Sequence, residues 1–281
     1  MIRNLARRAL NALLHPEIRL QADFPWGMAT MAKQYGIATA LYFLGNLIPL
    51  VLFFGGLVVL ARINPELANA LIKEPGRIEV GMVIAGFVCG FGLELWYIRR
   101  CFHKDGLTLR KTLGLNLDSL GGSWWAAIWR ALTCLALVFA IEVLYGLLPL
   151  PAPRDPAGQF LHTLTGWGFL AMAPIVVVGA ALFEELVFRG FLFNMLRTSF
   201  RKGRFQRCLR TAKAADYAAI VVSGAVFAGF HLTLTGFPLL FILGMVLAAL
   251  YRRTGSLIPS MILHGLNNLV ALLFLYFSMH S

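Results

Sequence analysis

The sequence has few charged residues and few cysteines, and each shortage excludes a class of protein. Charged residues make up 14% of its 281 residues, whereas hydrophobic residues make up 59%. A soluble domain carries roughly 25% charged residues, so the composition excludes an ordinary soluble domain and predicts a chain whose main solvent is lipid. The four cysteines are scattered and predict neither a disulfide framework nor a CxxC metal site.

Two familiar hydrolase motifs are also absent. The sequence contains no HExxH pattern, which places two zinc-binding histidines on one helix face. Ser223 lacks the glycine two residues before it that a serine-hydrolase elbow requires. The sequence therefore gives no support to either of these hydrolase types, and we interpret Ser223 as a small packing residue.

Long apolar runs are abundant instead. A helix needs roughly 20 apolar residues to cross the hydrocarbon core, and seven runs predict such helices: 36–61, 80–98, 131–150, 166–196, 217–234, 237–251 and 256–279. The run 237–251 is short for a complete crossing. The predicted fold is an all-α, polytopic transmembrane bundle of about seven spans.

The chain shows no internal repeat, which favours one membrane domain over residues 34–281. Before it, the segment MIRNLARRALNALL has arginines on one helical face and apolar residues on the other. This pattern is typical of a helix that lies in the membrane interface. We therefore predict a cytoplasmic interfacial segment over residues 1–33.

The net charge of +12 could suggest a nucleic-acid partner, but the positions of the basic residues indicate a membrane topology. With the N-terminus in the cytoplasm, only four of the 25 Lys and Arg fall on external segments: Arg62, Lys73, Arg77 and Arg154. This asymmetry follows the positive-inside rule. It predicts an integral membrane protein, with lipid and not nucleic acid as its surroundings. We expect a bacterial cytoplasmic membrane, and an endomembrane stays the alternative.

The fourth apolar run carries charges at a depth where they are costly. In GAALFEELVFRGF, Glu184, Glu185 and Arg189 have apolar turns on both sides. Glu185 and Arg189 are four residues apart, which predicts an ion pair on one helix face. Glu184 points roughly 100° away and needs another partner.

Partners of the right kind lie at similar depth on two later spans. His231 follows Phe227 by one turn in the fifth run, and the seventh run carries His264 and Asn268 one turn apart. Asn267 is a second candidate on that helix. A carboxylate pair, an arginine, two histidines and an asparagine exceed what helix packing needs and predict a functional site.

The chemistry that suits this set is hydrolysis. A carboxylate can take a proton from water, a histidine can orient that water, and a His plus Asn pair can donate to a developing oxyanion. We expect Glu184 to be the base, because Arg189 engages its neighbour Glu185.

The motifs EELVFRG (184–190), FAGFH (227–231) and HGLNN (264–268) resemble the CAAX prenyl protease and bacteriocin-processing family of membrane proteins, also called the Abi family. The resemblance covers roughly residues 166–275. It implies a type II CAAX endopeptidase-like fold and cleavage of a peptide or membrane-protein substrate in or beside the membrane. It also implies that Glu184 activates water with His231, that His264 and Asn268 are oxyanion donors, and that Glu185 and Arg189 support the site.

Three alternatives stay open. The family is described both as metal-free glutamate proteases and as metalloproteases. We expect no cofactor, but if zinc is used, its ligands would be Glu184, His231 and His264. A non-catalytic scaffold or bacteriocin self-immunity protein would keep the fold without the chemistry. A proton-coupled transporter would use Glu184 and His231 as a relay, although inverted repeats are missing.

Overall fold

The computed structural model describes residues 26, 28–73, 75–149, 156–164, 166–202, 207–209 and 211–280. All regular structure in this part of the chain is helical, which confirms the predicted fold class. Seven of its helices are long and apolar enough to cross a membrane, as the sequence predicts. The predicted interfacial helix near the start lies outside the described residues.

Six spans are helices that bear one label each: α2 (Met28–Ile63), α4 (Pro75–Lys104), α6 (Trp124–Gly146), α12 (Ala212–Phe230), α13 (Phe237–Thr254) and α14 (Leu257–His280). The seventh runs from Trp167 to Arg201 and consists of α8 (Trp167–Pro174), η2 (Ile175–Ala180), α9 (Ala181–Glu184), η3 (Glu185–Phe193) and α10 (Asn194–Arg201). Of these segments, η2 and η3 are π-helical. Short helices complete the order: α3 (Pro65–Lys73), α5 (Leu109–Thr112), η1 (Asp118–Leu120) and α7 (Pro156–Thr163).

All seven predicted spans have somewhat different bounds in the structure, and the first begins at Met28 and not at 36. The third begins at Trp124 and not at 131, because Ser123 caps the helix by accepting a hydrogen bond from the Ala126 amide at 3.2 Å. The short sixth run extends to Thr254 and makes an 18-residue helix. At 1.5 Å per residue this helix is about 27 Å long, close to the thickness of the hydrocarbon core.

The chain divides into two compact units. Unit 1 contains the described residues of Leu109–Pro153 and Glu184–His264, and unit 2 contains those of Trp26–Thr108, Arg154–Phe183 and Gly265–Ser281. This division does not test whether residues 34–281 fold as one membrane domain, so that statement stays a prediction.

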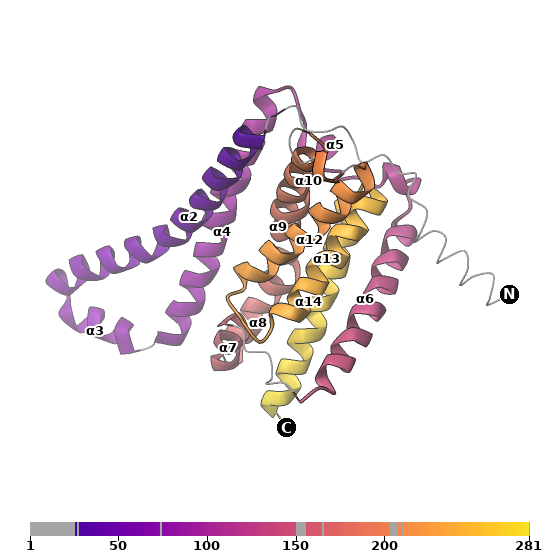
Figure 1. Cartoon of the computed structure of the whole chain (residues 1–281). Helices are drawn as coiled ribbons and strands as arrows, with labels where there is room; N and C mark the ends of the chain where they lie inside the picture. Colours follow the sequence, from indigo (N-terminus) through magenta and orange to yellow (C-terminus); the bar gives the residue numbers. More distant parts are fainter. Residues whose placement is uncertain are drawn as a thin grey trace. The chain divides into compact units, whose positions relative to one another are not determined.

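In unit 2, α2 and α4 lie side by side and α3 connects them (Figure 1). The two helices cross closely at Gly45, where a Cβ atom would lie 2.6 Å from the Cα of Gly90. Most of the α2 surface is apolar and exposed, including Val51 and Leu52. Such a surface suits lipid as its neighbour.

Unit 1 holds α6, η3, α10, α12 and α13 (Figure 1). Its tightest crossing joins α12 and α13, because a Cβ atom on Gly244 would lie 2.9 Å from the Cα of Gly224. Gly255 ends α13 in a left-handed conformation with φ +63°, which glycine adopts without steric cost. These contacts fix α12 and α13 beside the charged stretch of η3.

Candidate active site

Glu185 and Arg189 form the buried ion pair that their spacing predicts. Arg189 donates from Nη1 to Oε1 of Glu185 at 2.8 Å, and both side chains are fully buried. Nη2 of Arg189 donates to the Gly244 carbonyl at 3.2 Å, which the close approach of α13 makes possible. Burial of a charge is tolerated only when it is paired and hydrogen-bonded. Arg189 therefore neutralises Glu185 and ties η3 to α13.

The backbone that carries this pair is π-helical. Glu185 opens η3, and Asn194, directly after it, donates from Nδ2 to the Gly190 carbonyl at 2.9 Å. A π-helix has i to i+5 hydrogen bonds and occurs frequently at functional sites. The Asn194 amide thus satisfies a carbonyl near the end of the irregular stretch.

His264 lies against both glutamates. Its Nδ1 is 3.0 Å from Oε1 of Glu185, and its Nε2 is 3.8 Å from Oε2 of Glu184. An ionised carboxylate can only accept, so Nδ1 carries a proton and donates to Glu185. The His264 side chain is 3% exposed and the Glu184 side chain is 24% exposed. Glu184 is thus the more accessible of the two acids.

One oxygen of each glutamate has no hydrogen-bond partner among the described residues. Oε2 of Glu184 and Oε2 of Glu185 are both buried atoms. Buried polar atoms are rarely left unpaired, and exceptions call for an explanation. The 3.8 Å between Oε2 of Glu184 and Nε2 of His264 is too long for a direct hydrogen bond. These two atoms can therefore bind a third group that lies between them.

Phe227 joins the parts of the site. Its ring centroid lies 4.7 Å from that of His231 and 5.7 Å from that of His264. The guanidinium carbon of Arg189 lies 4.3 Å from the same ring, which is a favourable cation–π distance. One aromatic ring therefore contacts a cation and both imidazoles.

His231 stands at the end of α12. Its Nδ1 donates to the Phe227 carbonyl at 2.9 Å, because a carbonyl oxygen can only accept. Among the described residues, His231 makes no hydrogen bond or ion pair to Glu184 or Glu185. The next residue, Leu232, has φ +51°, a conformation that costs a non-glycine residue roughly 1–2 kcal/mol. The chain thus turns sharply just after this histidine.

A family model matches residues 124–270, a little over half of the chain, under the description type II CAAX prenyl endopeptidase Rce1-like. The chain belongs to this Rce1-like family. The family is one of proteases, so the protein is a peptidase in general terms and an integral membrane protein. Neither the curated proteins nor the solved structures contain a match to the chain.

Within this Rce1-like chain, unit 1 holds Glu184, Glu185, Arg189, His231 and His264, whereas Asn268 belongs to unit 2. There Asn268 donates from Nδ2 to the Val176 carbonyl at 2.9 Å. Its role as an oxyanion donor stays a prediction, as do the roles of the other residues.

The three alternative zinc ligands do not converge. No group of three His, Cys, Asp or Glu side chains in the described part of the chain could hold a metal ion. Glu184 approaches His264, but His231 is linked to that pair only through the Phe227 ring. The donor set therefore does not fit a zinc site, and metal dependence stays open to experiment.

Two features of this Rce1-like site were not predicted from the sequence. They are the contact of Phe227 with Arg189 and the carbonyl of Gly244 as an acceptor. The sequence does contain an indication of the Gly244 contact, because Gly224 and Gly244 lie in consecutive predicted spans. Small residues let membrane helices approach closely, which brings backbone acceptors within reach of a buried arginine.

Proposed function

We propose that this Rce1-like protein hydrolyses a peptide bond in or beside the membrane, with Glu184 as the base that activates water. The observation that carries this proposal is the position of His264 between the two glutamates, 3.0 Å from Glu185 and 3.8 Å from Glu184. Arg189 and His264 both engage Glu185. Glu184 is the acid left to act on a substrate.

The reaction would begin with a water molecule that donates one hydrogen bond to Oε2 of Glu184. Glu184 takes this proton while the water oxygen attacks the carbonyl carbon of the scissile bond. The tetrahedral intermediate collapses by breakage of the C–N bond, and Glu184 returns the proton to the leaving amine nitrogen. General base catalysis of this kind contributes about 10²–10⁴-fold to the rate.

His264 would act through its Nε2 atom, because Nδ1 is engaged by Glu185. A neutral imidazole accepts at Nε2, so it can hold the second hydrogen of the attacking water. It can stabilise the oxyanion only as an imidazolium. The oxyanion role implied for His264 therefore requires the doubly protonated form.

His231 would orient the water or the peptide from the other side of Phe227. Donation from Nδ1 to the Phe227 carbonyl leaves Nε2 of a neutral His231 as an acceptor. The imidazole is half-buried, so it is accessible to an incoming chain.

The proposed substrate is a membrane-associated peptide or membrane protein. The family description names CAAX prenyl endopeptidases, whose substrates carry an isoprenoid on a cysteine near the C-terminus. A substrate panel therefore needs prenylated and unmodified peptides of the same sequence. We further propose a bacterial cytoplasmic membrane with the N-terminus inside, on the strength of the positive-inside pattern.

The test is cleavage of such a panel by the protein reconstituted in liposomes, with mass spectrometry as the readout. We expect Glu184→Gln to cleave at least about 100-fold more slowly than wild type. Glu142→Gln is the matched control, since Glu142 is a half-buried glutamate on α6 of the same unit. Wild-type rates from a well-folded Glu184→Gln protein would refute the proposed base and favour a scaffold.

A chelator arm tests the metal question in the same assay. We expect full activity with chelator present. Loss of cleavage on chelation, with recovery on addition of zinc, would overturn the metal-free mechanism.

A further inference from the structure

Asp216 lies at the centre of a second charged cluster in unit 1. This aspartate is 3% exposed and sits in the first turns of α12. It accepts hydrogen bonds from Arg197 at 3.1 Å and Arg201 at 2.9 Å on Oδ1, and from Arg252 at 2.8 Å on Oδ2. Three helices, α10, α12 and α13, thus meet at one carboxylate.

The cluster contains more positive than negative charge. Arg201 and Arg252 pair with the same aspartate, and no other acidic side chain of the described residues pairs with either of them. Arg201 reaches both carboxylate oxygens, whereas Arg252 uses only Nε. In the described part of the chain no hydrogen bond joins a terminal Nη of Arg252 to Asp216, and the Arg252 side chain is 10% exposed. The two terminal Nη groups are the part of a guanidinium that binds planar or tetrahedral oxyanions in a bidentate manner.

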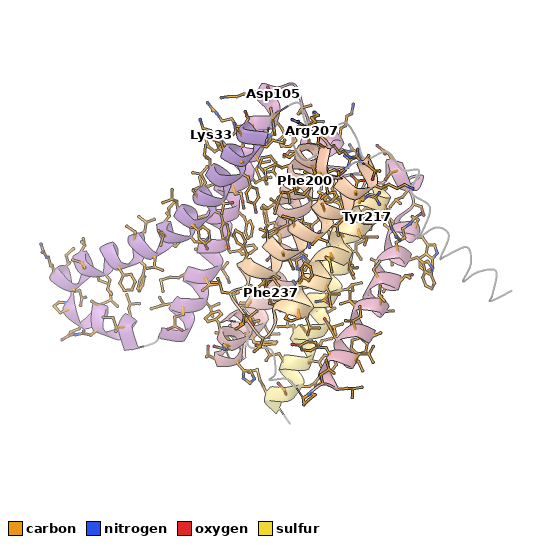
Figure 2. All side chains as sticks on the ribbon, in the orientation of Figure 1. Lys33, Asp105, Phe200, Arg207, Tyr217 and Phe237 are labelled. Carbon is orange, nitrogen blue, oxygen red and sulfur yellow. The ribbon has the colours of Figure 1, made fainter. Side chains whose placement is uncertain are left out.

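Aromatic residues place the cluster at the level of lipid headgroups. Tyr217 follows Asp216 and is 58% exposed, and the guanidinium carbon of Arg252 lies 5.4 Å from the Tyr217 ring centroid. Figure 2 shows Tyr217, Phe200 and Arg207 at one end of unit 1. Trp and Tyr side chains concentrate where the membrane meets water.

Three exposed tryptophans support the same assignment. Trp124, Trp125 and Trp129 lie in the first turns of α6. Ala127 at the start of α6 belongs to an apolar cluster with Leu117 and Leu120, and Ile258 at the start of α14 packs against this cluster. Helix α14 begins five residues after Arg252. The aromatic residues and the arginines therefore occupy the same end of the unit.

From this geometry we infer that Arg197, Arg201, Arg252 and Tyr217 form a binding site for the phosphate of an anionic phospholipid headgroup. A phosphodiester would cancel the surplus charge and accept hydrogen bonds from the Nη groups, while the Tyr217 ring packs beside the glycerol. To join the three helices, Asp216 would need one arginine from α10 and one from α13, so one of the two α10 arginines is additional. The lipid explains this additional arginine, and the site is separate from the proposed catalytic function.

The test compares two lipids on the purified protein in nanodiscs of phosphatidylcholine with a minor fraction of phosphatidylglycerol. Native mass spectrometry counts the lipids that remain bound. We expect wild type to retain phosphatidylglycerol preferentially, and Arg252→Gln to lower that preference about five-fold, as one basic residue near a charged membrane surface does. Lys202→Gln is the matched control, since Lys202 is exposed and makes no ion pair among the described residues.

Equal losses in Arg252→Gln and Lys202→Gln would overturn the site in favour of diffuse surface attraction. Absence of any preference in wild type would also overturn it, and this result does not depend on the folding of a variant. Displacement of phosphatidylglycerol by inorganic phosphate at equal concentration would show a site for soluble phosphate and refute the lipid. Glu184→Gln should retain the lipid as wild type does, so a failure here is distinct from a failure of the proposed hydrolysis.

Discussion

Nδ1 of His264 lies 3.0 Å from Oε1 of Glu185, the oxygen that also accepts from Arg189. A single carboxylate oxygen thus orients a cation from its own helix and an imidazole from α14. The second glutamate, Glu184, faces the opposite nitrogen of that imidazole. Of the two adjacent glutamates, Glu185 therefore orients the His264 ring, and Glu184 is the one that we propose as the base.

The Glu185–Arg189 pair yields a prediction about stability. Glu185→Leu or Arg189→Leu leaves one buried charge without a partner, and each should lower the free energy of unfolding by about 3–5 kcal/mol. The double variant removes both charges and should be more stable than either single variant. Denaturant unfolding in detergent measures all three. A double variant that loses the sum of the two single losses would contradict the buried pair.

Phe227 yields a prediction about the cation–π contact. Phe227→Leu removes the ring on which Arg189 and both imidazoles pack, and we expect a loss of about 2 kcal/mol in unfolding free energy together with slower cleavage. Phe230→Leu is the control, because Phe230 contacts Phe188 but is 44% exposed. Equal effects of the two substitutions on cleavage would show that the Phe227 ring has no special role.

The crossing of α12 and α13 yields a prediction about glycine. A Cβ atom at Gly224 would lie 3.0 Å from the Met245 amide nitrogen and 3.1 Å from the Phe241 carbonyl. Gly224→Ala should therefore push the helices apart and lower the thermal midpoint. Gly229→Ala on the same helix meets nothing within 4 Å and should be neutral or stabilising, since alanine favours helix by up to about 1 kcal/mol. A higher midpoint for Gly224→Ala would refute the close crossing.

Ser223 yields a prediction that separates two hydrolytic mechanisms. Its side chain is fully buried, and its hydroxyl donates to the Phe188 carbonyl at 3.4 Å. Ser223→Ala should therefore cleave peptides at close to the wild-type rate. A loss of two orders of magnitude without a change in folding would indicate a serine nucleophile and reject Glu184 as the base.

Much of the fold follows from the sequence because lipid imposes a simple rule. Backbone polar groups in hydrocarbon must pair within the segment, so a sufficiently long apolar run becomes a helix. The seven runs follow this rule. The start of α6 was placed too late because Arg130 interrupts the apolar pattern, whereas in the structure the Ser123 cap determines where the helix begins.

The candidate site was only partly predictable. The ion pair between Glu185 and Arg189 follows from helical spacing alone, and so does the packing of Phe227 on His231. The approach of His264 to both glutamates depends on how separate helices pack. Similar depth along the spans makes such an approach possible, but it does not decide which nitrogen faces which acid.

The Asp216 cluster shows a different limit of sequence reasoning. Its three arginines come from two segments about fifty residues apart, and in the sequence they resemble ordinary topogenic charge. Only the meeting of α10 with α13 reveals that they share one counterion. Charge counting along a chain does not report which charges converge.

The π-helical stretch η3 connects these two clusters, because Glu185 and Arg189 lie within it and Arg197 and Arg201 follow on α10. Each π turn accommodates about one residue more than an α turn. If the stretch changed to α pitch with its length unchanged, each extra residue would turn the downstream helix by roughly 100°. Arg197 and Arg201 would then face away from Asp216, so the π geometry of η3 sets the direction in which both arginines point.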